Sequence, residues 1–228
     1  MKILITTDLH GKWSWYEWLS QRQVDLIVIA GDLIDLLACD DHEIECATAF
    51  LAGFHSPIAV ASGNHDNPFA WFPRLDSIDI LTDGQSKFFG DLLVTALPFD
   101  ETDPGDNDVI LHNAQKQVGR HPWLLIHHDP PYGSPCGSPV GGKAASTQIL
   151  RQIRQYRPDY LASGHWHNQP YVGSWYCKVG PTICFNAGQP EIRAIVRPNC
   201  IYLDTSLRRA WWMNTQMWGK PTAHVDFN

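Results

Sequence analysis

The chain has 228 residues, of which 44% are hydrophobic and 18% are charged, and its formal net charge is -7 at pH 7. This size and hydrophobic share predict one globular domain over residues 1–228. The acidic balance makes nucleic acid an unlikely main partner, because non-specific binders carry an excess of Lys and Arg. No apolar run reaches the ~20 residues of a membrane span, and the N-terminal apolar stretch is too short for a signal peptide. We therefore expect a cytoplasmic protein.

The first 66 residues alternate between strand and helix patterns. The segment Val24–Ala30 is almost entirely apolar, as in a strand that is buried on both faces. The rhythm predicts parallel strands joined by right-handed crossovers, and ligands bind beyond the carboxyl ends of such strands. The expected strands are Lys2–Thr7, Val24–Ala30 and Pro57–Ala61, and the expected helices are Ser14–Gln23 and Asp40–Gly53.

The second part of the chain predicts another sheet. Residues 78–98 contain short strands separated by turn residues, at Ile78–Leu81, Lys87–Phe89 and Leu92–Leu97. Two strand-rich stretches with crossover helices indicate an α/β fold, a four-layer α/β/β/α sandwich in which two mixed sheets pack face to face. The later expected elements are helices at Val109–Gly119 and Lys143–Tyr156, and strands at Pro122–Ile126, Asp159–Ser163, Thr182–Asn186, Ile192–Val196, Cys200–Asp204 and Ala210–Asn214.

Five of the predicted strand ends carry side chains that bind metals well. Each pattern alone has a structural explanation: Gly31-Asp32 suits a helix cap, and Asn64 suits a turn. Together, imidazole, carboxylate and amide groups at one sheet edge favour a metal site. The candidate ligands are Asp8, His10, Asp32, Asn64, His128, His165 and His167.

Four imidazoles, two carboxylates and one amide exceed the needs of a single ion, so we expect two divalent metals. Mixed nitrogen and oxygen ligands suit Mn, Fe, Zn, Ni or Co better than calcium. Two ions about 3.5–4 Å apart need a shared anion, and Asp32 ends a central strand. A bridging water would become hydroxide near neutral pH and attack phosphorus. His65 is the candidate general acid for the leaving group, and Asp66 is the candidate that orients His65.

These motifs resemble the calcineurin-like metallophosphoesterases. The matching series is Asp8-Leu9-His10, Gly31-Asp32, Gly63-Asn64-His65-Asp66, His128-Asp129-Pro130-Pro131 and Gly164-His165-Trp166-His167. The resemblance implies one metal on Asp8, His10, Asp32 and His167, and a second on Asp32, Asn64, His128 and His165. It also implies that His65 is the acid. Alignment of the two prolines selects His128, and its neighbour His127 stays as an alternative ligand.

The chain departs from family members that act on phosphoproteins. No arginine follows Gly31-Asp32 within residues 33–37, and Asp66 stands where those members carry Glu. The chain is more similar to small phosphodiesterases, which implies a small-molecule or nucleotide phosphoester as substrate. One alternative is a nuclease, which would need a basic groove. The other is a non-catalytic scaffold, which would have lost metal ligands.

Several other features have two interpretations. Trp166 lies between two candidate ligands and either stacks on a substrate or packs locally. The aromatic residues Trp13, Trp15, Tyr16 and Trp18 form either a wall for a nucleobase or a helix packing face. Trp211, Trp212 and Trp218 indicate either a contact surface, such as a homodimer interface, or a final strand. The six cysteines form no C-x-x-C pair and are expected to be buried and reduced.

Overall fold

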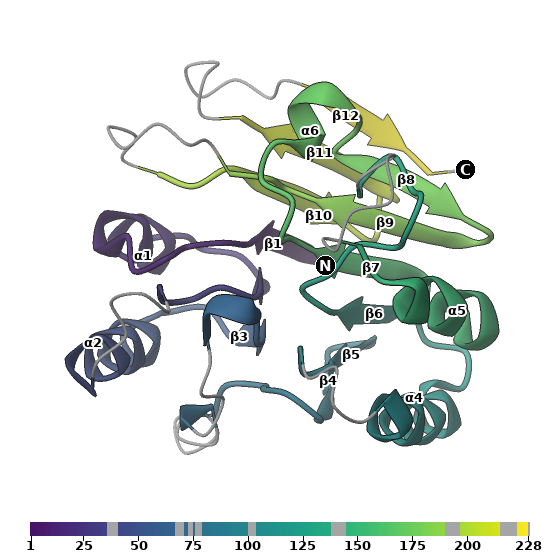
Figure 1. The fold of residues 1–228 in the computed structure, drawn as a ribbon, viewed down its shortest axis with the longest axis horizontal. Coiled ribbons are helices and arrows are strands. Elements are labelled where there is room, and N and C mark those ends of the chain that lie inside the picture. The colour runs from purple at the N-terminus through teal and green to yellow at the C-terminus, as the bar shows by residue number, and fades with distance from the viewer. Residues whose placement is uncertain are drawn as a thin grey trace.

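The computed structural model describes residues 1–35, 41–66, 71–72, 75, 79–99, 104–137, 145–189, 197–214 and 223–227. These residues form two mixed six-stranded β-sheets (Figure 1). Parallel β1, β2 and β3 form one side of the first sheet, and antiparallel strands from the C-terminal region form the other. The strand order of this sheet is β12 (Ala223–Asp226), β11 (Arg209–Met213), β10 (Cys200–Asp204), β1 (Lys2–Thr6), β2 (Leu26–Ala30) and β3 (Ile58–Ala61).

The second sheet has four parallel strands at its centre and an antiparallel strand at each edge. Its strand order is β4 (Ser86–Phe89), β5 (Leu92–Ala96), β6 (Trp123–Ile126), β7 (Tyr160–Ser163), β9 (Thr182–Asn186) and β8 (Tyr176–Val179). The parallel strands of both sheets are almost entirely apolar, which is typical of strands covered on both faces.

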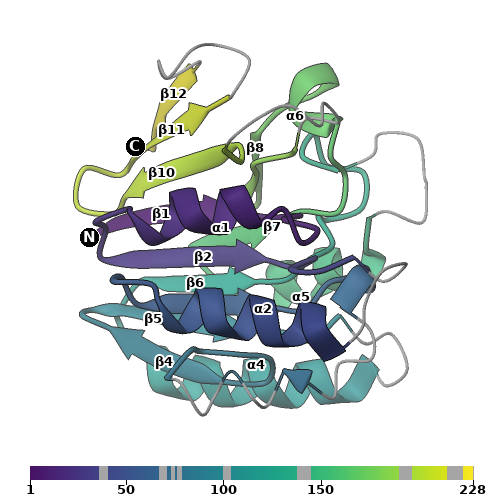
Figure 2. The ribbon, with the colours of Figure 1, turned by 90° about the vertical axis from the view of Figure 1, so that its left-hand side faces the viewer.

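Helices cover the outer faces of the two sheets. Helices α1 (Trp13–Ser20) and α2 (Asp41–Ala52) lie on the first sheet, and α4 (Pro104–Val118) and α5 (Thr147–Tyr156) lie on the second (Figures 1 and 2). Alternate residues of β1 show how the layers pack. Ile3 and Ile5 belong to the core between the sheets, and Leu4 belongs to the core below α1 and α2. A third core lies between the second sheet and helices α4 and α5. The predicted four-layer sandwich is confirmed.

Some element boundaries differ from the predictions, and each has a local cause. β2 begins at Leu26, because the Asp25 carboxylate accepts a hydrogen bond from the Lys2 backbone N at 2.6 Å before the strand pairs. Leu81 makes a single bridge to Ala59, so the strand predicted at Ile78–Leu81 is not found among its described residues. Helix α5 begins after Ser146, whose hydroxyl accepts from the Ile149 backbone N at 3.2 Å.

Four short elements were not predicted: the 3-10 helix η1 (Asn64–Asp66), α6 (Gln169–Val172), β8 and β12. The strand expected at Ile192–Val196 lies outside the described residues. Within the described part of the chain, none of the helices has both the length and the apolar character needed to cross a bilayer.

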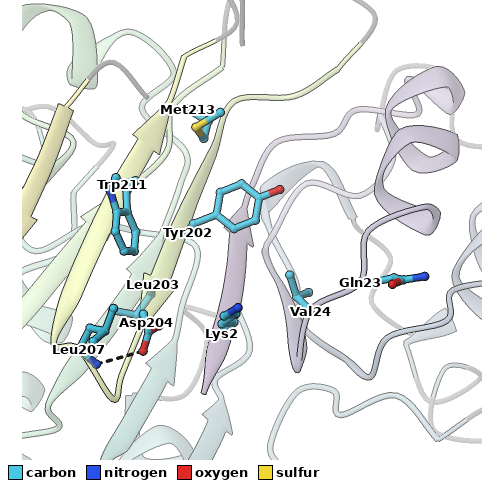
Figure 3. A pocket seen from close by; sticks show the side chains of 9 residues that line it. All are labelled: Lys2, Gln23, Val24, Tyr202, Leu203, Asp204, Leu207, Trp211 and Met213. Atoms are coloured by element: carbon cyan, nitrogen blue, oxygen red, sulfur yellow. Dashed lines mark hydrogen bonds between the residues drawn. The ribbon is translucent and has the colours of Figure 1, made fainter. Parts of the chain in front are cut away.

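The C-terminal tryptophans have separate roles. Trp212 is buried, and its indole Nε1 donates to the Ala187 carbonyl at 2.9 Å, so it packs in the core of a final strand. Trp211 points to the outer face of β10 and β11, where it lines a cavity of about 490 Å³ with Tyr202 and Met213 (Figure 3). None of the predicted metal ligands lines this cavity. Trp218 lies outside the described residues.

Candidate metal centre

The topology brings the predicted ligands to one end of the two sheets. β1, β2 and β3 run parallel in the first sheet, and β5, β6, β7 and β9 run parallel in the second. The carboxyl ends of β1, β2 and β6 face the same side, on the right in Figure 2. The polar residues that follow these strands therefore converge, as expected for a ligand site in a parallel sheet.

The backbone at this end adopts conformations that non-glycine residues avoid. Seven described non-glycine residues have positive φ, and four of them are predicted ligands: Asp8 at 54°, His10 at 46°, Asp32 at 54° and His165 at 65°. Such conformations are uncommon outside glycine and concentrate at functional sites. Backbone hydrogen bonds hold them, from Asp8 N to Gly31 O at 3.0 Å and from His10 N to Asp32 O at 2.9 Å.

Asp8, His10 and His167 form a first group. The Nε2 of His167 lies 3.1 Å from Oδ1 of Asp8 and 3.2 Å from Nε2 of His10. The ligand atoms of all three residues lie within 4.8 Å of one another, which is a spacing that a single metal ion can bridge. Two imidazole nitrogens that face each other across this distance fit a shared cation between them.

Asp32, Asn64, His128 and His165 form a second group. The Nε2 of His128 lies 3.2 Å from Oδ2 of Asp32 and 3.1 Å from Oδ1 of Asn64. The same Asn64 oxygen lies 2.7 Å from Nδ1 of His165. Oδ2 of Asp32 is also 3.7 Å from Nε2 of His10 in the first group. Asp32 therefore lies between the two groups, where the predicted shared ligand belongs.

Two glycines allow this close packing. A Cβ at Gly31 would lie 2.3 Å from Nδ1 of His128, and a Cβ at Gly63 would lie 2.2 Å from Oδ1 of Asp32. Both spaces are already filled by ligand side chains. The glycines in Gly31-Asp32 and Gly63-Asn64 are therefore needed for close approach as well as for backbone conformation.

The charges of the site compensate one another. Burial would raise the pKa of Asp8, but His167, His128 and His10 lower it well below its usual value. Burial would lower the pKa of His128, but the negative charges of Asp32 and Asp8 raise it above its usual value. Burial and the charge of His128 lower the pKa of His165 to about 4. Because ligands bind metals in their deprotonated forms, a cation would compete with protons for His128.

Two observations show that these residues fit divalent metals. Oδ2 of Asp8 is buried and has no hydrogen-bond partner in the described structure, although a buried carboxylate oxygen is costly without one. In addition, Nδ1 of His128 lies 2.7 Å from the Ala30 carbonyl, which fixes the proton on Nδ1 and directs Nε2 into the site. A carbonyl partner of this kind is typical of metal-binding histidines.

The alternative ligand His127 lies outside both groups. Its Nδ1 accepts a hydrogen bond from the Asp129 backbone N at 3.0 Å, and burial lowers the pKa of its ring to about 3. The geometry therefore favours His128.

The prediction that Asp66 orients His65 is wrong. Oδ1 of Asp66 accepts from the backbone N of Leu33 at 2.8 Å and of Ile34 at 3.1 Å, and Oδ2 accepts from Gly63 N at 2.8 Å. Asp66 thus connects the loop after β2 with the loop after β3 through hydrogen bonds. Burial raises the pKa of its carboxyl well above the usual value.

Asp35 is the carboxylate beside His65, with Oδ1 3.2 Å from Nδ1 of His65. It lies in the segment that follows Gly31-Asp32, and the sequence interpretation missed it. Its spacing of three residues from Asp32, after a strand end, is the signal that was available.

Aromatic residues surround the centre unevenly. Trp15 and Tyr16 are buried residues of α1, and the ring of Trp13 stacks on Phe50 of α2 at 5.7 Å. These residues therefore pack α1 against the first sheet and α2. Trp166 is half-buried beside the site. Phe99 was not predicted; its ring stacks on His165 at 6.0 Å and meets His128 edge-on at 5.5 Å.

The chain belongs to the calcineurin-like phosphoesterases, because the family model of that description matches residues 1–169. A comparison with curated proteins found no match. Among solved structures, the chain is similar to the protein TT1561 of Thermus thermophilus, with a TM-score of 0.66 and 15% identity over 94% of each chain.

Two further solved structures share the fold. One is an archaeal phosphodiesterase, with a TM-score of 0.54 and 16% identity over 93% of this chain and 98% of that chain. The other is a dimetal phosphatase from Danio rerio, with a TM-score of 0.60 and 12% identity over 93% of this chain and 95% of that chain.

Proposed function

We propose that this chain is a phosphodiesterase that uses two divalent metals to hydrolyse small-molecule or nucleotide phosphodiesters. The observation that carries the proposal is the convergence of seven ligand-type side chains from distant segments, with Asp32 3.2 Å from His128 and 3.7 Å from His10. Asp8, His10, Asp32 and His167 would hold one metal, and Asp32, Asn64, His128 and His165 the other. When bound, such metals would neutralise phosphoryl oxygens and lower the pKa of water.

His65 is positioned to protonate the leaving oxygen. Its Nδ1 faces the Asp35 carboxylate, which leaves Nε2 as the nitrogen for proton transfer. The ring lies 4.7 Å from the ring of His10 in an edge-on arrangement, so His65 borders the first metal group. We propose Asp35 as the residue that holds this tautomer, in the role that a carboxylate takes beside a catalytic imidazole.

Sequence features and two aromatic side chains indicate the substrate class. The arginine-free segment 33–37 argues against phosphoproteins, and the net charge of -7 argues against long nucleic acids. Trp166 and Phe99 lie beside the ligands and would contact the organic part of a substrate. The cytoplasmic location, the homodimer and the choice of manganese stay predictions.

Hydrolysis of bis(p-nitrophenyl) phosphate tests the proposal. The metal-stripped protein should gain activity with Mn²⁺, lose it with EDTA, and prefer this diester to p-nitrophenyl phosphate. Plasmid DNA and single-stranded DNA serve as nuclease substrates in parallel. A protein that binds Mn²⁺ but cleaves neither ester would contradict the proposed enzyme and favour the non-catalytic scaffold.

A further inference from the structure

Three cysteines meet on the outer face of the second sheet, in the core below α4 and α5. Cys177 in β8 pairs directly with Cys184 in β9. Cys136 lies in the segment after β6, with its sulfur 3.4 Å from the Cys184 carbonyl oxygen. A single buried cysteine packs like any small apolar residue, but three thiols side by side require a chemical explanation.

The sulfur of Cys177 is surrounded by hydrogen-bond donors. The thiols of Cys136 and Cys184, the backbone N of Cys136 and the hydroxyl of Ser134 lie around it. These donors favour the thiolate, so they lower the pKa of Cys177, and the Cys136 thiol has the largest effect. Burial raises the pKa of Cys136 well above its usual value. The pKa of Cys177 is therefore lowered, whereas the pKa values of its neighbours Cys136 and Cys184 are raised.

Cys177 is also the one of the three cysteines that has exposed surface. Its exposed fraction is 7%, while Cys136 and Cys184 have none. A cavity of about 270 Å³ is lined by Ser134 and by Lys178, the residue after Cys177 in β8, but not by Cys177 itself. A molecule the size of hydrogen peroxide would fit this cavity.

Cys136 and Cys184 are the two possible disulfide partners of Cys177, and they differ in how freely their backbone can move. Cys184 lies in β9, which is paired on both sides by β7 and β8. Cys136 lies in a turn in which Gly137 N bonds to Ser134 O at 2.9 Å, outside the named strands. Formation of a disulfide requires specific Cα and Cβ geometry, and a turn adjusts to this more readily than a central strand.

We propose that Cys177 and Cys136 form a peroxide-sensitive dithiol site. The Cys177 thiolate attacks one oxygen of hydrogen peroxide, the O–O bond breaks, and hydroxide leaves with a proton as water. The Cys136 sulfur then attacks the resulting sulfenic acid, forming the S–S bond and releasing a second water. Two thiols and one peroxide give one disulfide and two waters, and the two electrons pass from sulfur to peroxide.

The site is connected to the turn that carries His165 and His167. Nδ2 of Asn186 lies 3.1 Å from the Cys136 carbonyl, 3.3 Å from that of Gly164 and 3.2 Å from that of Trp166. A disulfide at Cys136 would therefore affect a turn that is hydrogen-bonded to Asn186. The same Asn186 side chain donates to the turn that carries His165 and His167.

Mass spectrometry of the full chain tests the proposal without reference to phosphoesterase activity. Reduced protein is treated with a small excess of hydrogen peroxide, alkylated and digested. We expect a loss of two hydrogen atoms per chain, a linked peptide pair containing Cys136 and Cys177, and reversal by dithiothreitol. Cys136→Ser should leave a sulfenic acid on Cys177 that dimedone traps, and Cys177→Ser should give neither product.

Two controls separate this site from general oxidation. Cys200→Ser removes a buried thiol of a different core and should leave the disulfide unchanged. Cys46 is more exposed and reports non-specific oxidation. Oxidation at Cys46 without the linked pair, or a disulfide between Cys177 and Cys184 in the wild-type protein, would overturn the assignment. Because the wild-type digest is decisive by itself, poor folding of a variant would not obscure the result.

Discussion

The two sheets contribute different chemistry to the same centre. The first sheet supplies both carboxylates and the amide, from Asp8, Asp32 and Asn64, whereas the second sheet supplies only imidazoles, from His128, His165 and His167. The first-sheet turns also hold three of the four ligands with left-handed backbone. The carboxylates of the first sheet therefore face imidazoles that differ from one another, because the pKa values of His128 and His167 are raised and that of His165 is lowered.

Removal of the shared carboxylate should have the largest effect. Asp32→Asn keeps the shape but removes the negative charge between the two groups, so we expect Mn²⁺ affinity to fall by more than about 100-fold and hydrolysis to be lost. Isothermal titration calorimetry and diester turnover measure this. Asp91→Asn, on an exposed turn at the other end of the sheets, is the matched control and should behave like the wild type.

Substitution of His65, the proposed general acid, should lower turnover without weakening metal binding. His65→Gln should lower kcat on a poor leaving group by about 10²–10⁴, because general acid catalysis contributes about that much. Mn²⁺ affinity should be unchanged. Asp35→Asn should have a smaller effect in the same direction, since it acts through the imidazole. Full activity of His65→Gln on an alkyl ester would disprove the acid assignment.

The ligand proposed from the end of β6 can be tested by comparing variants of the neighbouring residues His127 and His128. His128→Gln should weaken Mn²⁺ binding by about 10–100-fold, while His127→Gln should change it little, because its ring bonds to Asp129 and not to the other ligands. Metal titrations of both variants make the comparison. A stronger effect at His127 would mean that the ligand has been misassigned.

The smallest expected effect is on stability, and it concerns hydrogen bonds that connect Ser62 at the end of β3 with residues that flank β4 and β5. The Ser62 hydroxyl accepts from the Phe99 backbone N at 3.0 Å, and Ser62 N donates to Asp83 at 2.9 Å. Burial raises the pKa of Asp83 to about 6. A raised carboxyl pKa means that the folded state binds the proton more tightly, so the free energy of unfolding should fall as pH rises from about 4 through about 6.

The loss attributable to Asp83 should be at most about 3 kcal/mol, since each pKa unit corresponds to about 1.4 kcal/mol. Urea denaturation at several pH values measures it. Asp83→Asn retains an acceptor for Ser62 N and should flatten this part of the pH profile. An unchanged profile in the variant would assign the pH dependence to another group.

The sequence predicted which residues converge at the strand ends better than it predicted which residues hold them in place. The identity of Asp8, His10 and Asp32 followed from their positions after strand patterns, because strand ends in a parallel sheet share an edge. The partner of His65 did not follow. Adjacency in the chain suggested Asp66, but the turn at residues 64–66 directs that carboxylate to three backbone amides, and Asp35 reaches the imidazole from another loop.

Local patterns of apolar runs and polar strand ends were sufficient to predict the layered α/β architecture and the residue types that gather at the centre. The contacts that favour His128 over His127, that place Asp35 beside His65 and that bring Cys136 close to Cys177 are visible only in the three-dimensional structure. These outcomes depend on which side chains meet across two sheets and their loops. Such contacts are set by packing over the whole chain and leave no periodic signal in any one segment.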